Sequence, residues 1–241
     1  MSVIFSVFPT MRRSKSAPQP SLRRSFGWWS AVLFFQFTVT AGAGNIVITV
    51  KDKKGAPVKD AVVYALPVSG RPPFRKARAE VVQRDKQFVP YVSAVQVGSL
   101  VQFPNQDNVK HHIYSFSPAK KFELPLYAGT PAEPIVFETA GVVTLGCNIH
   151  DWMIAYILVV PTPWFGVTGP SGEARLRDLP AGSYDLEVWQ PRLKNSSNRP
   201  RQRAVVKVDS SVSFQLDLKP DFRLRSSPTP ADSDDSDDGY R

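Results

Sequence analysis

The sequence predicts an all-β protein built from two β-sandwiches, and three observations lead to that prediction. No stretch of the chain shows the period of an amphipathic helix. Short segments rich in Val, Ile, Phe and Tyr recur instead, with clusters of Gly, Pro, Asn and Asp between them. Short strands that end at such turn residues are typical of sandwiches, whereas α/β proteins alternate strands with longer helical patterns. The body of the chain, residues 44–220, is long enough for two small domains.

The predicted strands are the apolar segments themselves. In chain order they cover residues 46–50, 61–65, 95–103, 142–145 and 154–160. The chain after Pro220 is rich in Ser, Pro and Asp and is predicted to be a disordered acidic tail, residues 221–241.

The first 43 residues are predicted to be an export signal and not part of the fold. A basic region without acidic residues precedes an apolar run of 15 residues, 26–40. Ala41-Gly42-Ala43 then supplies small residues for cleavage. The run is shorter than the ~20 residues of a bilayer span, so we expect no stable membrane span after cleavage, with an uncleaved anchor as the alternative. Arg23-Arg24-Ser25-Phe26 resembles a twin-arginine signal, so two export routes stay open, both to the periplasm or another exported location.

Cys147 is the single cysteine of the chain, and it predicts a metal ligand. One cysteine cannot close a disulfide within the chain. In an oxidising compartment a free thiol invites oxidation, which binding to a metal prevents. The alternative is a buried cysteine that behaves as a small apolar residue.

The residues near Cys147 extend the predicted site. His150 and Met153 follow it with the spacing Cys-x2-His-x2-Met, and the other two histidines, His111 and His112, lie together about forty residues upstream. Two histidines, one cysteine and a weak axial methionine form the ligand set of a mononuclear blue-copper site. On a strand adjacent side chains point to opposite faces, so one of the two histidines, preferably His111, faces the core with Ile113.

Residues 71–163 resemble a cupredoxin of the amicyanin and plastocyanin type. The resemblance depends on two runs of residues: Phe88, Pro90, Val95, Val97, Gly98, Val101, Phe103, Asn105, Asp107 and His111, then Phe137, Gly141, Cys147, His150, Met153 and the apolar strand 154–160. It implies a Greek-key sandwich with copper held by His111, Cys147, His150 and Met153. The short ligand loop is similar to that of amicyanin. In this respect the chain resembles methylamine-utilization-type periplasmic proteins. Two departures are His112 in place of an asparagine, and Val143 and Leu145 in place of tyrosines.

The resemblance also implies how electrons enter the site. His150 corresponds to the solvent-exposed histidine of cupredoxins, through which a redox partner protein reduces or oxidises the copper. Trp152 is expected either on the rim of an apolar docking patch or packed beneath the loop. Asp107 and Asn105 are expected to hold the turn before His111 through hydrogen bonds to the backbone.

The segments on either side of this region resemble two parts of one domain. Residues 48–63, from Ile48-Thr49-Val50, resemble the opening of a carboxypeptidase regulatory-like domain, a transthyretin-like sandwich, and residues 172–189 resemble its continuation. We therefore expect one smaller sandwich, residues 44–70 and 164–220, into which the cupredoxin is inserted. Two separate flanking modules are the alternative, although so short a first segment buries too little surface to fold alone.

These features predict an exported type 1 copper protein that acts in one-electron transfer. The alternatives are a copper-binding or copper-delivery protein with the same ligands, and a structural binding module with a secondary copper site. No catalytic triad, phosphate-binding glycine loop or second copper centre is evident, so we expect no enzyme. The formal charge of +9 comes without a dense basic run interleaved with aromatics, so no nucleic-acid partner is expected.

Overall fold

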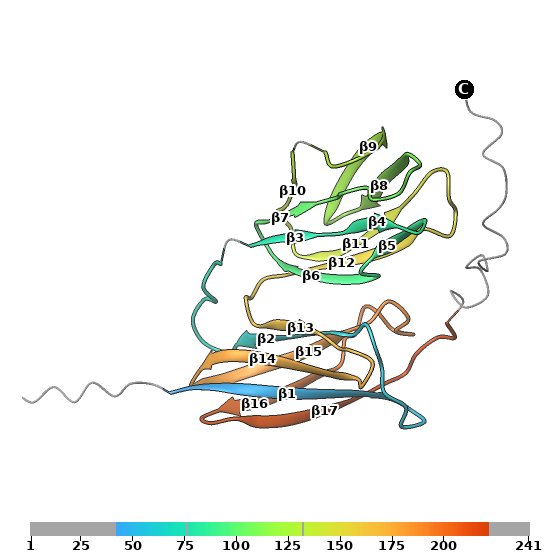
Figure 1. Ribbon diagram of the computed structural model, residues 1–241. Helices are drawn as coiled ribbons and strands as arrows, with labels where there is room; N and C mark the ends of the chain where they lie inside the picture. The colour runs from blue at the N-terminus through green and yellow to red at the C-terminus, as the bar shows by residue number, and fades with distance from the viewer. Residues whose placement is uncertain (1–41, 76, 132, 222–241) are drawn as a thin grey trace, which may run out of the picture. The chain divides into compact units, whose positions relative to one another are not determined.

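The structure of the protein is a computed structural model that describes residues 42–75, 77–131 and 133–221 (Figure 1). All regular elements of these residues are β-strands, which confirms the predicted all-β class. The described residues include no helix that is long and apolar enough to cross a membrane. The predicted export signal and the predicted acidic tail lie outside the described residues, apart from a few residues at their inner ends.

Strands from both ends of the described chain form two sheets. They are β1 (Ala43–Asp52), β2 (Val62–Pro67), β13 (Phe165–Val167), β14 (Glu173–Pro180), β15 (Gly182–Trp189), β16 (Arg201–Val206) and β17 (Ser210–Leu216). In one sheet β1 lies between antiparallel β14 and parallel β17. In the other, β2 lies between β13 and β15, and β16 follows β15. Strands before residue 71 therefore pair with strands after residue 163, as the colours of Figure 1 show.

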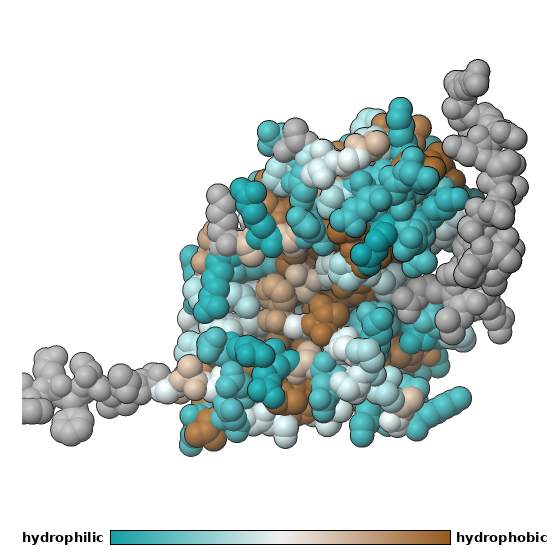
Figure 2. Space-filling model, in the orientation of Figure 1, coloured by the Kyte–Doolittle hydropathy of each residue, from teal (hydrophilic) through white to brown (hydrophobic). Residues whose placement is uncertain are grey.

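Strand β1 explains how these two sheets make a core. Ile46, Ile48 and Val50 are fully buried, whereas Val47 and Thr49 between them are only partly buried and Lys51 after them is exposed. This alternation is the period of a strand that is covered on one face only. Polar residues accordingly cover much of the molecular face drawn in Figure 2.

The middle of the chain forms the remaining sheets. Its strands are β3 (Arg78–Glu80), β4 (Val82–Arg84), β5 (Gln87–Val89), β6 (Val92–Gln96), β7 (Ser99–Gln102), β8 (His111–Ser117), β9 (Lys120–Tyr127), β10 (Ile135–Phe137), β11 (Gly141–Gly146) and β12 (Ile154–Val160). Five of them form a sheet in the order β6-β12-β11-β8-β9, three form a sheet in the order β10-β7-β3, and β4 and β5 form a hairpin.

One predicted strand is wrong in this region. The expected strand over residues 95–103 is two strands, β6 and β7, which belong to different sheets. The chain turns at Gly98, whose φ of 86° lies in the left-handed region that glycine enters at no steric cost. The predicted strands at 142–145 and 154–160 are present as β11 and β12.

Strand β12 contributes to two apolar cores. Ile157 and Leu158 are both fully buried, although they are neighbours in sequence. Ile157 packs in a cluster with Phe103, Cys147 and Met153. Leu158 packs in another cluster, with residues such as Ile48 of β1. Because successive side chains of a strand point to opposite faces, one strand is shared by both cores.

Candidate metal centre

Two pairs of neighbouring strands bring the predicted ligands together. His111 is the first residue of β8, and Cys147 follows the last residue of β11. Gly146 pairs with Tyr114 across these two strands, which fixes the ends of β8 and β11 beside each other. A Cβ atom at Gly146 would lie 2.7 Å from the Tyr114 ring, so a larger residue at this position requires the Tyr114 side chain to move. Residues 147–153 then form the loop between β11 and β12.

His111, Cys147 and His150 converge in space. Their candidate ligand atoms all lie within 4.8 Å of one another. The Cys147 sulfur is 3.8 Å from Nδ1 of His150, and the centroids of the two histidine rings are 4.9 Å apart. His111 and Cys147 are buried, whereas His150 is partly exposed. The arrangement offers two imidazoles and one sulfur to a single ion, with one imidazole at the surface.

Met153 closes the loop that carries two of these residues. Its backbone N–H donates a hydrogen bond of 2.9 Å to the carbonyl of His150. Its side chain is only 2% exposed and belongs to the same apolar cluster as Cys147. The loop thus buries the thioether on the side of the core.

The imidazole ring of His111 is held by a hydrogen bond at one of its two nitrogens. Its Nε2 atom lies 2.7 Å from a carboxylate oxygen of Asp107. A carboxylate only accepts hydrogen bonds, so Nε2 carries the proton of this bond. The other ring nitrogen, Nδ1, is buried and has no hydrogen-bond partner among the described residues. An unpaired buried nitrogen is costly, and a metal ion is one partner that would satisfy it.

The electrostatics of the site favour a thiolate. Burial alone raises the pKa of Cys147, but the nearby imidazole of His111 and the backbone N–H groups of Ile149, His112 and His150 outweigh it, so the pKa is lowered. Burial alone lowers the pKa of His111, but the nearby Cys147 and the hydrogen-bonded carboxylate of Asp107 raise it overall. Since the thiolate is the form of cysteine that binds metals, the chain prepares the sulfur for coordination.

His112 lies outside this cluster. Its Nε2 atom is 2.8 Å from Glu123, and its side chain is 12% exposed, while His111 and Ile113 are fully buried. The expected alternation along this strand is confirmed, because His111 and Ile113 face the core and His112 does not. His112 contributes its backbone N–H to the Cys147 sulfur, while its imidazole pairs with β9.

The rim of the site is partly apolar. Ile149 and Trp152 flank His150 in the sequence, and 47% and 37% of their surfaces are exposed. The centroids of the His150 and Trp152 rings are 5.2 Å apart, and the indole N–H of Trp152 donates to the carbonyl of Lys86 over 3.1 Å. Trp152 therefore lies on the rim and not beneath the loop.

The sequence pattern missed the full role of Asp107. Asn105 holds the turn as expected, because its Oδ1 accepts the N–H of Asp107 at 2.9 Å and its Nδ2 donates to Val109. Asp107 instead bonds His111 and two residues of a distant hairpin, Asp85 and Lys86. The spacing of four residues between Asp107 and His111 was the sequence feature that could have indicated this contact.

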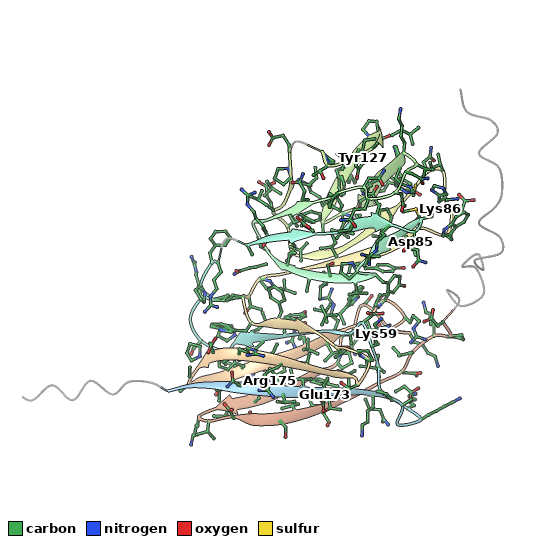
Figure 3. The ribbon with its side chains drawn as sticks, viewed as in Figure 1. Lys59, Asp85, Lys86, Tyr127, Glu173 and Arg175 are labelled. Atoms are coloured by element: carbon green, nitrogen blue, oxygen red, sulfur yellow. The ribbon has the colours of Figure 1, made fainter. Side chains whose placement is uncertain are left out.

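A tyrosine of β9, Tyr127, pairs with His111 across the sheet. Tyr127, labelled in Figure 3, donates a hydrogen bond of 2.7 Å to the carbonyl of Phe103 and accepts one of 2.6 Å from Gln83. Burial raises the pKa of Tyr127 to about 12, and the charge of Cys147 adds to the rise. The phenol of Tyr127 therefore stays neutral near pH 7.

Comparisons with known proteins found similar structures over part of the chain. A purple cupredoxin from Nitrosopumilus maritimus is 24% identical, the match covers 34% of this chain and 99% of that one, and the TM-score is 0.31. A copper-containing nitrite reductase from Thermus scotoductus is 23% identical over 39% of this chain and 25% of its own, with a TM-score of 0.33. A mutant of amicyanin in its Cu(I) form is 19% identical over 40% of this chain and 99% of its own, with a TM-score of 0.32. No protein-family model and no curated protein sequence matches the chain.

Proposed function

We propose that this protein is an exported copper protein that carries single electrons. His111, Cys147 and His150 hold the metal, and Met153 is the weak axial ligand. One observation supports the proposal above all others: two imidazoles and a sulfur converge within 4.8 Å of one another. Asp107 occupies Nε2 of His111 and leaves Nδ1 for the metal.

The donor set fits copper. Thiolate and thioether ligands favour Cu(I), and imidazole suits both oxidation states of the metal. Copper held by such donors supplies reversible one-electron chemistry. The residues of the chain hold the donors in place before the metal arrives. The lowered pKa of Cys147 favours the thiolate form of its sulfur, and the hydrogen bond to Asp107 fixes the ring of His111.

The partly exposed His150 is the proposed point of electron entry and exit. Ile149 and Trp152 surround it with exposed apolar surface. Such a patch excludes water when a partner docks, and its small size suits a transient complex. The proposed partner is a redox protein that presents its own centre to this rim.

We also propose the domain organisation that the sequence predicts. Residues 44–70 and 164–220 form one transthyretin-like sandwich, and residues 71–163 form the copper domain inserted in it. The pairing of β1 with β14 and β17, and of β2 with β13 and β15, supports this division. The proposed location is the periplasm or another exported compartment, on the basis of the leader pattern in residues 1–43.

A copper-delivery protein is the second candidate, because the same donors favour Cu(I) and one of them reaches the surface. The two functions differ in whether the metal stays through a redox cycle. A carrier keeps its copper when it is reduced and reoxidised in the presence of a Cu(I) chelator. A delivery protein gives up the metal at the reduction step.

The first experiment adds Cu(II) to the purified protein and records visible spectra of the wild type and of Cys147→Ser. We expect an intense thiolate-to-copper band in the wild type and none in the variant. Met153→Leu is the companion variant, because this volume-conserving swap costs less than about 1.5 kcal/mol of stability. It is expected to keep the band and shift it. A folded wild-type protein without the band would refute the proposal.

A further inference from the structure

The hairpin turn between β4 and β5 connects the two halves of the candidate site. Its central residues are Asp85 and Lys86, labelled in Figure 3, with φ angles of 54° and 52°. Arg84 and Gln87 pair on either side of them, so the loop has two residues. Positive φ at both central residues defines a type I′ turn, which Asn-Gly fills more easily than Asp-Lys. The surrounding contacts therefore hold this turn in place.

Asp107 supplies most of those contacts. One carboxylate oxygen accepts the N–H of Asp85 at 2.7 Å, and the other accepts the N–H of Lys86 at 3.0 Å. The second oxygen also accepts the Nε2–H of His111 at 2.7 Å. The Asp107 side chain is only 11% exposed, so these three bonds compete little with water. A single carboxylate thus joins the turn to the imidazole of His111.

The other half of the site reaches the same turn. The indole of Trp152 donates to the carbonyl of Lys86 at 3.1 Å, and its ring lies against that of His150. Residues 107–111 and residues 147–153, which are far apart in sequence, are therefore tied to the backbone N–H and the backbone carbonyl of one residue, Lys86. Neither tie involves a donor atom of the metal site.

We propose that Asp107 is a positioning residue for copper and that the β4–β5 turn transmits its effect to the ligand loop. The inference rests on the proposed copper site. Through its bond to Nε2, Asp107 fixes His111 in the tautomer whose Nδ1 lone pair is available for the metal. Its negative charge, close to the ion and largely shielded from water, favours Cu(II) over Cu(I).

The expected loss of copper affinity can be judged from other proteins in which a carboxylate orients a ligating histidine. Loss of a carboxylate that orients a ligating histidine costs about 10- to 100-fold in metal affinity. If Cu(II) binding weakens more than Cu(I) binding, the reduction potential rises, by about 59 mV for each tenfold change in their ratio. A residue that only stabilised the fold would change neither the ratio nor the tautomer.

The chain offers a matched control. Glu123 also contacts the Nε2 atom of a histidine, His112, at 2.8 Å, but this imidazole is not among the candidate ligands. Asp107→Asn and Glu123→Gln therefore make the same chemical change, from carboxylate to amide, at the partners of two adjacent histidines. We expect Asp107→Asn to weaken Cu(II) binding by about 10- to 100-fold and to raise the reduction potential, whereas Glu123→Gln changes affinity less than about twofold. Equal effects of the two variants would overturn the proposal.

A second readout needs neither copper nor a variant that folds. In the metal-free wild-type protein, ¹⁵N NMR above the pKa of His111 reports which ring nitrogen carries the proton. We expect the proton on Nε2, and a proton on Nδ1 would overturn the proposal. This measurement uses no metal, so it separates the two proposals. A wild-type protein that bound no copper would refute the proposed function, whereas the position of the proton would still show whether Asp107 fixes the tautomer of His111.

The role of the turn is tested by a double-mutant cycle. Trp152→Phe keeps the aromatic ring and removes the donor to Lys86. If the turn transmits the effect, the losses in Cu(II) affinity from Asp107→Asn and Trp152→Phe are non-additive by at least about threefold, because both contacts meet at the backbone of one residue, Lys86. Additive losses would show that the turn transmits nothing and would overturn that part of the proposal.

Discussion

The shared strand β12 gives a stability prediction that tests how the two cores depend on each other. Ile157 and Leu158 are both fully buried but pack in different apolar clusters. Replacing either by alanine removes three buried carbon groups, worth about 2.4 kcal/mol in transfer free energy. The cavity left behind brings the expected loss to about 3 kcal/mol for each variant.

The expected result is a common effect on both cores. Because β12 belongs to both clusters, we expect Ile157→Ala and Leu158→Ala each to lower the free energy of one cooperative unfolding transition. Native-state hydrogen exchange, followed by mass spectrometry, resolves the two regions. At about 3 kcal/mol, exchange rises by about 100-fold in residues 43–67 and in residues 141–160 alike.

Val208→Ala is the control, because Val208 is 72% exposed and such changes stay within about 0.5 kcal/mol. The reasoning fails if Leu158→Ala accelerates exchange only in residues 43–67 and leaves residues 141–160 protected. The two cores would then unfold independently, although they share a strand.

Two further predictions concern a buried phenol and a close backbone contact. Burial and the hydrogen bond to Glu187 raise the pKa of Tyr64 from 10.0 to about 12. The phenol thus contributes stability that is complete below pH 10 and is lost as the pH rises towards 12, by about 2 to 3 kcal/mol. Urea unfolding of Tyr64→Phe should show a smaller loss in this range, and parallel wild-type and variant curves would contradict the assignment. Gly146→Ala should cost about 1 to 3 kcal/mol and weaken the thiolate band, because its Cβ would lie 2.7 Å from the ring of Tyr114. Gly169→Ala, with no atom within 4 Å of its Cβ, should change neither, and an equal effect of both alanines would refute the steric explanation.

Much of the candidate site was predictable because its residue types are scarce. One cysteine and three histidines leave few ways to assemble a soft-metal site, and Cys147, His150 and Met153 are close in sequence. The choice between His111 and His112 followed from strand alternation, and the observed burial agrees with it. These inferences needed local chemistry, the period of a strand and the resemblance of residues 71–163 to a cupredoxin.

The contacts of Asp107 and Trp152 with the β4–β5 turn were beyond the sequence pattern. Asp107 lies about twenty residues from Lys86, and Trp152 lies 66 residues from it. Hydrogen bonds over such separations depend on the register of several strands, which local patterns do not fix. The same limit explains the strand predicted over 95–103, because the sequence does not show that β6 and β7 pair in different sheets on the two sides of Gly98.

The sequence by itself determined the all-β class, the apolar positions of the main strands and the set of candidate ligands. Only the tertiary structure decided that β12 serves two cores, that Nδ1 of His111 is left unpaired, and that one carboxylate links the imidazole to a distant turn. The physical reason is that strand periodicity and donor chemistry are local properties of the chain. The pairing of strands across long separations is a property of the whole fold.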